Sequence, residues 1–196
     1  METEQVNRVM GDEEKERARG VGTKRKVRYT DLFIRLVALL LSLAAAIILG
    51  LDKQSKVVPI TLVSTLPPIK VPVTAKYHYL SAFTYFVVAN AVACSYGAVT
   101  LILTVATRGS KTGKLAKAII ILDLIMVAVL ASANGAAAAV GYLGHEGNKH
   151  VRWNKVCNIF GRFCNLVIVA VGVSLLGSLL YIFLVVLAVL SVHKKH

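Results

Sequence analysis

The sequence predicts an all-α membrane protein, a four-transmembrane-helix bundle with short loops and cytosolic termini. Hydrophobic residues make up 56% of the 196 residues and charged residues 17%, a balance that leaves too little polar surface for a soluble domain of this size. Four apolar stretches are each long enough to cross a hydrocarbon core of roughly 30 Å. These predicted spans are residues 32–51, 79–105, 118–143 and 165–192.

Lysine and arginine residues outside the spans are divided unevenly between the two sides that four crossings define. The N-terminal tail has 8, residues 106–117 have 4 and the C-terminus has 2, which gives 14, whereas the other two loops have 4 each, which gives 8. Because the side richer in these residues is usually cytosolic, we expect both termini in the cytosol. No nucleic-acid motif accompanies the net charge of +13, so we expect the charge to set topology and expect no nucleic-acid partner.

The chain divides into a tail, a membrane domain and a short end. Residues 1–31 mix acids and bases and hold almost no apolar bulk, so we expect a disordered cytosolic tail. A polar stretch of this length before a full-length span is unlike a signal peptide, and the first span is expected to be an uncleaved anchor. Residues 32–193 form the predicted four-helix membrane domain, and residues 194–196 a cytosolic end.

Two charged residues fall inside the predicted spans. Arg35 is the fourth residue of the first span and Asp123 the sixth of the third, and a carboxylate at such a position needs a partner inside the bundle. If both termini are cytosolic, these two spans run parallel and the two residues differ in depth by only about 3 Å. We therefore predict a structural intramembrane ion pair between Arg35 and Asp123. The alternative is that Arg35 pairs locally with Asp31 or reaches the lipid headgroups.

Small residues recur at a spacing of four on every predicted span. Such seams let transmembrane helices approach closely. Four seams are more than one bundle needs, so we expect some of them to remain spare and to bind other copies. The third span also places Leu130, Asn134, Ala137 and Gly141 on the face of Asp123, which we expect to point at protein. The seams are Ser42/Ala46/Gly50, Ala89/Ala93/Gly97, Ala133/Ala137/Gly141 and Ala170/Ser174/Ser178.

The two loops on the far side from the termini have different compositions. Residues 52–78 are rich in Val, Thr and Pro and are expected to be extended and partly strand-like. Residues 144–164 contain Cys157 and Cys164, which form an extracellular disulfide if the chain bends between them. In one continuous helix they would lie roughly 10 Å apart, beyond bridging range. Asn158, Gly161 and Asn165 are poor helix formers and favour the disulfide.

The sequence shows no pattern that supports catalysis, and we expect no enzyme and no cofactor. His145 and His150 are five residues apart, not the four that place two imidazoles on one helix face, and no third ligand is spaced nearby, so no metal site is expected. The alternative to a structural role is a small membrane transporter or channel subunit that uses Arg35 and Asp123. An acid that is already paired, with no further acid in the membrane, makes a poor proton relay.

Together, the intramembrane Arg35 and Asp123, the expected cytosolic termini and the Cys157 and Cys164 pair resemble the Casparian strip membrane domain protein-like family, plant four-span proteins related to MARVEL proteins. The stretch from Tyr79 to Asn90 is similar to the start of the second span in that group. The resemblance covers residues from about 28 to 193. Claudin-like and tetraspanin-like cysteine patterns are absent from the sequence.

The resemblance implies a multi-pass scaffold in the plasma membrane that forms homo-oligomers and hetero-oligomers with related four-span proteins. Founding members assemble into a membrane platform or barrier and recruit secreted wall-modifying enzymes. In this sequence the basic segment from Lys70 to Lys76 replaces the acidic and aromatic signature of their first outer loop. The resemblance therefore implies a general scaffold in the lipid bilayer more directly than assembly of a strip.

Overall fold

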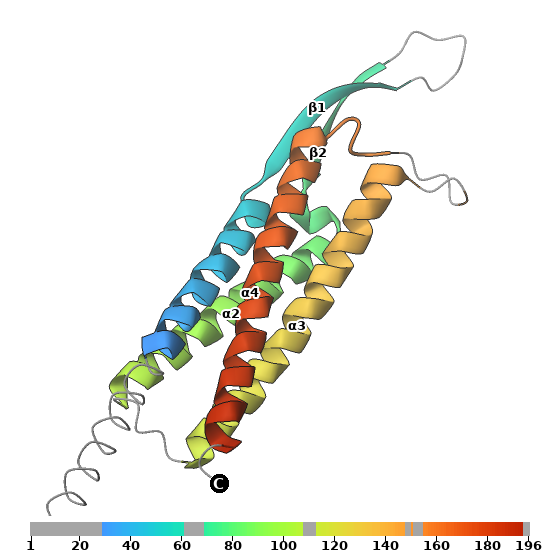
Figure 1. Ribbon diagram of the computed structural model, residues 1–196. Helices are drawn as coiled ribbons and strands as arrows, with labels where there is room; N and C mark the ends of the chain where they lie inside the picture. Colours follow the sequence, from blue (N-terminus) through green and yellow to red (C-terminus); the bar gives the residue numbers. More distant parts are fainter. Residues whose placement is uncertain (1–28, 61–68, 108–112, 148–149, 151–154, 194–196) are drawn as a thin grey trace, which may run out of the picture.

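The computed structural model describes residues 29–60, 69–107, 113–147, 150 and 155–193. Within this part of the chain, four helices are long and apolar enough to cross a membrane: Tyr29–Gly50, α2 (Ser81–Ala106), α3 (Gly113–Glu146) and α4 (Gly161–His193). They lie side by side along one direction (Figure 1). The predicted four-helix bundle is confirmed.

The helices do not end where hydropathy alone places the spans. Helix α3 begins at residue 113 rather than 118 and ends at Glu146, and α4 begins at Gly161 rather than at residue 165. Lysines are good helix formers, so α3 extends through Lys114 and Lys117 beyond the apolar stretch. Of the expected tail, residues 1–28 lie outside the described residues, as do residues 194–196, whereas Tyr29 to Asp31 already belong to the first helix.

The small-residue seams face the inside of the bundle. Gly97 shows how tightly the helices pack, because a methyl group at this position would lie 2.9 Å from the Tyr181 hydroxyl oxygen. One chain therefore buries nine of the twelve seam residues itself, so most of the seams are used for packing within the bundle. The buried seam residues are Ser42, Ala89, Ala93, Gly97, Ala133, Ala137, Ala170, Ser174 and Ser178, and Ala46, Gly50 and Gly141 are half-buried.

The outward faces of the helices are apolar. Large aliphatic side chains are exposed on all four of them, including Leu40, Ile102, Leu124 and Leu176. A surface of this kind needs lipid or other apolar partners around it. Together with the four spans, it describes a multi-pass membrane protein.

A two-stranded antiparallel hairpin extends beyond the helices at the end of the bundle opposite the C-terminus (Figure 1). Strand β1 (Lys53–Ile60) pairs with β2 (Ile69–Lys76), with Lys53 opposite Lys76 and Ile60 opposite Ile69. The short helix η1 (Tyr77–Tyr79) then leads into α2. The strands agree with the extended structure expected for this loop from its β-branched residues.

Candidate functional site

Arg35 and Asp123 face each other inside the bundle. The Arg35 guanidinium donates two hydrogen bonds to the carboxylate, from Nη2 to Oδ2 at 2.7 Å and from Nη1 to Oδ1 at 3.1 Å. This two-pronged geometry is the strongest way for an arginine to bind a carboxylate. The Asp123 side chain is 0% exposed and that of Arg35 is 3% exposed, so neither charge reaches the surrounding medium from this position.

A tyrosine on α2 completes the surroundings of the carboxylate. The Tyr96 hydroxyl donates to Asp123 Oδ1 at 2.6 Å, and its oxygen lies 3.2 Å from the carbonyl oxygen of Ile119. Arg35 Nη1 also lies 3.4 Å from the Thr100 hydroxyl oxygen, again on α2. The cluster therefore joins the first helix, α2 and α3.

Sequence reasoning missed Tyr96. Measured from the observed helix ends, Tyr96 lies ten residues before the last residue of α2 (106 − 96) and Asp123 ten residues after the first residue of α3 (123 − 113). The two residues therefore lie at the same depth, because α2 and α3 are antiparallel neighbours. The predicted start of the third span at residue 118 placed Asp123 closer to the end of its helix, so the equal depth of Tyr96 and Asp123 was not apparent from the sequence.

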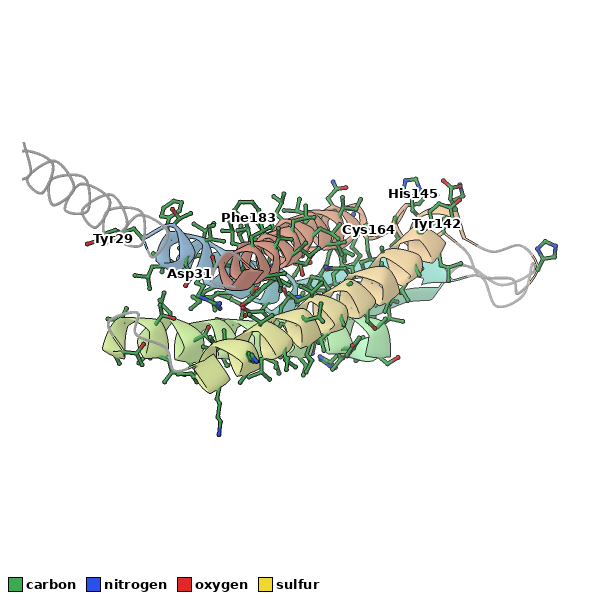
Figure 2. The ribbon with its side chains drawn as sticks, turned by 60° about the horizontal axis from the view of Figure 1, so that its bottom comes forward. Tyr29, Asp31, Tyr142, His145, Cys164 and Phe183 are labelled. Atoms are coloured by element: carbon green, nitrogen blue, oxygen red, sulfur yellow. A yellow bond between two sulfur atoms is a disulfide. The ribbon has the colours of Figure 1, made fainter. Side chains whose placement is uncertain are left out.

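Asp31 is a second partner of Arg35. Its Oδ1 lies 3.4 Å from Arg35 Nε, an ion-pair distance without the geometry of a hydrogen bond. The Asp31 side chain is 27% exposed and lies near one end of the bundle (Figure 2). The two partners considered for Arg35 thus coexist, with Asp123 the closer and more deeply buried one.

A second group of polar side chains lies further along the bundle. Ser174 on α4 donates to Asn90 Oδ1 on α2 at 2.9 Å, and the Tyr181 hydroxyl donates to the Ala93 carbonyl oxygen at 2.9 Å. Asn134, on the face of α3 that carries Asp123, is 2% exposed, and neither amide atom has a hydrogen-bond partner among the described residues. These contacts join helices without bringing a nucleophile and a base together.

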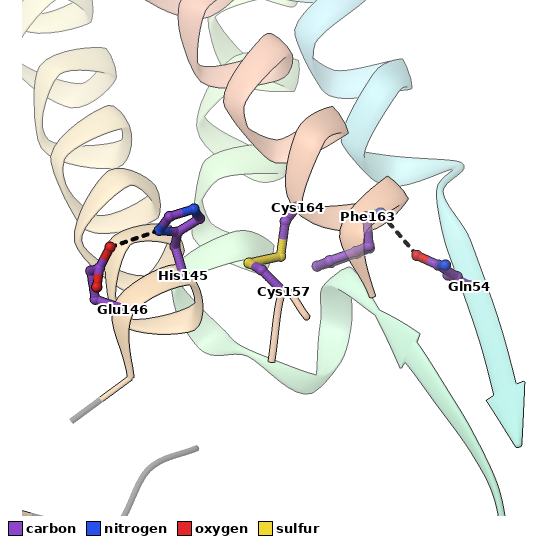
Figure 3. The surroundings of a disulfide bond; sticks show 6 residues. All are labelled: Gln54, His145, Glu146, Cys157, Phe163 and Cys164. Carbon is purple, nitrogen blue, oxygen red and sulfur yellow. Dashed lines mark hydrogen bonds and ion pairs between the residues drawn. A yellow bond between two sulfur atoms is a disulfide. The ribbon is translucent and has the colours of Figure 1, made fainter. Parts of the chain in front are cut away.

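A disulfide lies at the opposite end of the bundle. Cys157 and Cys164 are bonded, with their Cα atoms 5.7 Å apart (Figure 3). The continuous helix considered from the sequence is wrong here, because α4 begins only at Gly161 and Cys157 lies in the turn before it. Cys94, the third cysteine, is not part of this bond.

Contacts around the disulfide tie the loop to its neighbours. The backbone N–H groups of Val156 and Cys157 donate to the Gly144 carbonyl oxygen at 2.9 and 3.1 Å. The Phe163 N–H donates to Gln54 Oε1 at 2.9 Å (Figure 3), which links α4 to β1. The loop before α4 is thus held to the end of α3, and α4 to the base of the hairpin.

Charged side chains at this end form a surface network rather than a metal site. Glu146 accepts from Lys155 Nζ at 3.3 Å and lies 3.0 Å from His145 Nδ1. Within the described parts of the chain, no three His, Cys, Asp or Glu side chains gather closely enough to hold a metal ion.

Comparison with known proteins identifies the family to which this chain belongs. Residues 24–180 match the Casparian strip membrane protein domain. The chain belongs to the Casparian strip membrane protein domain family. The resemblance seen in the sequence is thereby confirmed, and the matched residues include Arg35, Asp123 and both bonded cysteines. The family has no known catalytic activity.

Relatives from several plants align over most of the chain. CASP-like protein 1E2 of Vitis vinifera is 53% identical over 196 residues, which is 100% of both chains. CASP-like protein 1E1 of Populus trichocarpa is 58% identical over 84% of this chain and 83% of its own length. CASP-like protein 1E1 of Arabidopsis thaliana is 45% identical over 97% of this chain and 99% of its own length. No solved structure matches the chain.

Proposed function

We propose that this family member is a scaffold in the plasma membrane. It assembles with copies of itself and with related four-span proteins into a platform or barrier, and it recruits secreted cell-wall-modifying enzymes without chemistry of its own. Both termini lie in the cytosol, and the hairpin and the disulfide-bonded loop lie outside the cell.

The buried ion pair between Arg35 and Asp123 is the main observation behind this proposal. Both oxygens of Asp123 accept hydrogen bonds from groups of the same chain, and Asp123 is the only acid of the sequence within the predicted spans. A proton or ion pathway needs a series of groups that exchange with water. A single buried acid held by an arginine and a tyrosine instead fixes the register of the helices, as a scaffold requires.

Two independent features support the proposed orientation. The lysine and arginine count favours cytosolic termini. The disulfide includes Cys164 in the first turn of α4, at the other end of that helix from the C-terminus, and disulfides persist in oxidising compartments rather than in the cytosol. Both features support a hairpin end that lies outside the cell.

Oligomer formation rests on family membership rather than on the seams, which one chain uses internally. Contacts between copies would have to use the exposed aliphatic faces, where Leu, Ile and Val side chains lie outside the bundle. Helix association inside lipid is driven by packing and hydrogen bonds rather than by the hydrophobic effect. We therefore expect assemblies in native-like lipid that detergent disperses more easily than it unfolds the bundle.

A fluorescent fusion of the full chain in plant cells tests the proposal. A scaffold gives confined patches with slow recovery after photobleaching, and cross-linking at low expression gives dimers or larger species. Uniform spread with rapid recovery would argue against it. A purified protein that stays monomeric in lipid and moves an ion across liposome membranes would replace it with the transport alternative.

A further inference from the structure

One face of the hairpin carries lysines and hydroxyl groups and points away from the helices. Lys53 lies opposite Lys76, and Ser55 lies opposite Thr74, with the two hydroxyl oxygens 2.9 Å apart. Because side chains alternate along a strand, these four residues share a face. We refer to them as the lysine face.

The other face at the base of the hairpin is turned toward the bundle. Gln54 accepts the hydrogen bond from Phe163 at the start of α4, and Ala75, opposite Gln54 in the register, packs against the hydrophobic core. Since these neighbours point inward, the lysine face is turned outward. Lys53 and Ser55 are exposed, and Thr74 and Lys76 are half-buried.

The charges on this face lack compensation. Like charges directly opposite each other in an antiparallel pair are destabilising, and no acid pairs with Lys53 or Lys76 among the described residues. The hairpin segment 53–76 contains four lysines and no acid. Over both loops at this end, eight lysines and arginines stand against Asp52 and Glu146, a difference of 8 − 2 = +6.

We propose that the lysine face binds an acidic polysaccharide, a linear polymer with repeating carboxylates. A carboxylate between the Lys53 and Lys76 ammonium groups would relieve their repulsion, and the neighbouring hydroxyls of Ser55 and Thr74 suit the hydroxyl groups of a sugar chain. The inference rests on the proposed orientation, in which this end lies outside the cell.

The spread of the lysines along the hairpin favours a polymer over lipid headgroups. In the strand register Lys70 lies opposite Pro59, six residues beyond Lys53, which corresponds to about 20 Å at the rise of a strand. The hairpin continues past the helix ends (Figure 1), whereas the headgroup layer of one leaflet is only about 5–8 Å thick. The hairpin backbone therefore extends from the lysine face to a level, at residue 70, that a plane of phosphates does not reach.

The composition of the face favours a polymer over a folded protein partner. Stable protein interfaces bury roughly 1,200–2,000 Å² around an apolar centre. Two lysines and two hydroxyl groups supply no such centre. A repeating polyanion needs none, because many weak contacts along one chain add together.

The test measures binding of polygalacturonic acid to the full chain in nanodiscs of neutral phosphatidylcholine. The variant Lys53→Gln with Lys76→Gln removes two charges from the lysine face. Lys114→Gln with Lys117→Gln is the matched control. It removes two exposed charges at the start of α3, at the end of the bundle opposite the hairpin (Figure 1). We expect the first variant to lower affinity on the order of tenfold, since each exposed ion pair contributes modestly, and the control to bind like the unmodified chain.

The methyl-esterified polymer provides a second measurement that needs no variant. It lacks the carboxylate charge, and the unmodified chain should bind it far more weakly and with little dependence on salt. Equal binding of the two polymers, or an equal loss in both variants, would overturn the inference. If the lysine face contacts phosphatidylserine headgroups in discs that contain this lipid but binds no polymer in neutral discs, the face belongs to lipid and the inference is also overturned. The orientation is tested separately by tag accessibility, so failure of the polymer assay and failure of the proposed orientation are distinguishable.

Discussion

Removing one partner of the buried ion pair should destabilise the bundle strongly. In Arg35→Leu the Asp123 carboxylate keeps only the Tyr96 hydroxyl as a donor. In Asp123→Leu the Arg35 guanidinium keeps the more distant Asp31 and Thr100. Because an uncompensated charge remains in a low-dielectric interior, each change should cost about 3–5 kcal/mol.

Removing both partners together should be much milder. The variant Arg35→Leu with Asp123→Leu leaves no buried charge at this position, and replacing an intact buried pair by apolar residues is often nearly neutral. Tyr96 loses its carboxylate acceptor, but its hydroxyl oxygen already lies 3.2 Å from the Ile119 carbonyl oxygen, to which it can donate instead. We therefore expect the double variant to lie within roughly 2 kcal/mol of the unmodified chain.

A double-mutant cycle measures the coupling. Thermal unfolding in lipid discs gives the free energies, and surface abundance in cells gives a parallel readout. The expected coupling is several kcal/mol, since the summed cost of the single changes should far exceed the cost of the double change. Additive effects within error would show that Arg35 and Asp123 do not stabilise each other, and the reasoning would fail.

Three further predictions concern other parts of the molecule. Tyr96→Phe should cost about 1.5–3 kcal/mol in the same unfolding assay, because it removes a hydrogen bond to a charged group, and an unchanged midpoint would contradict this. Cys157→Ser should lower stability by about 2.5 kcal/mol in oxidising buffer by the loop-entropy estimate, whereas Cys94→Ser, the control, should leave the disulfide intact in thiol labelling. Tags at either terminus or within residues 106–117 should be inaccessible on intact cells, and a C-terminal tag exposed outside would show that the orientation is inverted.

The bundle and its ion pair follow from strong local signals. Four apolar stretches fix the helices, and a charge inside a span needs a partner, which the similar depths of Arg35 and Asp123 supply. Arg35 and Asp123 are therefore identifiable from the sequence alone. Tyr96 is not, because a tyrosine is tolerated in many transmembrane environments, and only the true start of α3 at Gly113 shows that it lies at the depth of the acid.

The small-residue seams and the cysteines are patterns that the sequence alone does not resolve to one structure. A small-residue spacing predicts close packing but not the partner, and the seams prove to face helices of the same chain. Whether the disulfide can form depends on where α4 begins. The composition of the loop favoured a late start of α4 but did not fix it. The outward direction of the lysine face follows only from the strand register and from the contact between Gln54 and Phe163, neither of which has a sequence signature.

The behaviour of the charge-free variant in cells tests the central claim most directly. If the buried pair only holds the bundle together, a fluorescent fusion of Arg35→Leu with Asp123→Leu should reach the plasma membrane and form the same confined, slowly recovering patches as the unmodified chain. Neither single variant should do so. A double variant that reaches the surface at normal levels but spreads uniformly would show that the charges themselves perform the function, and would contradict the account.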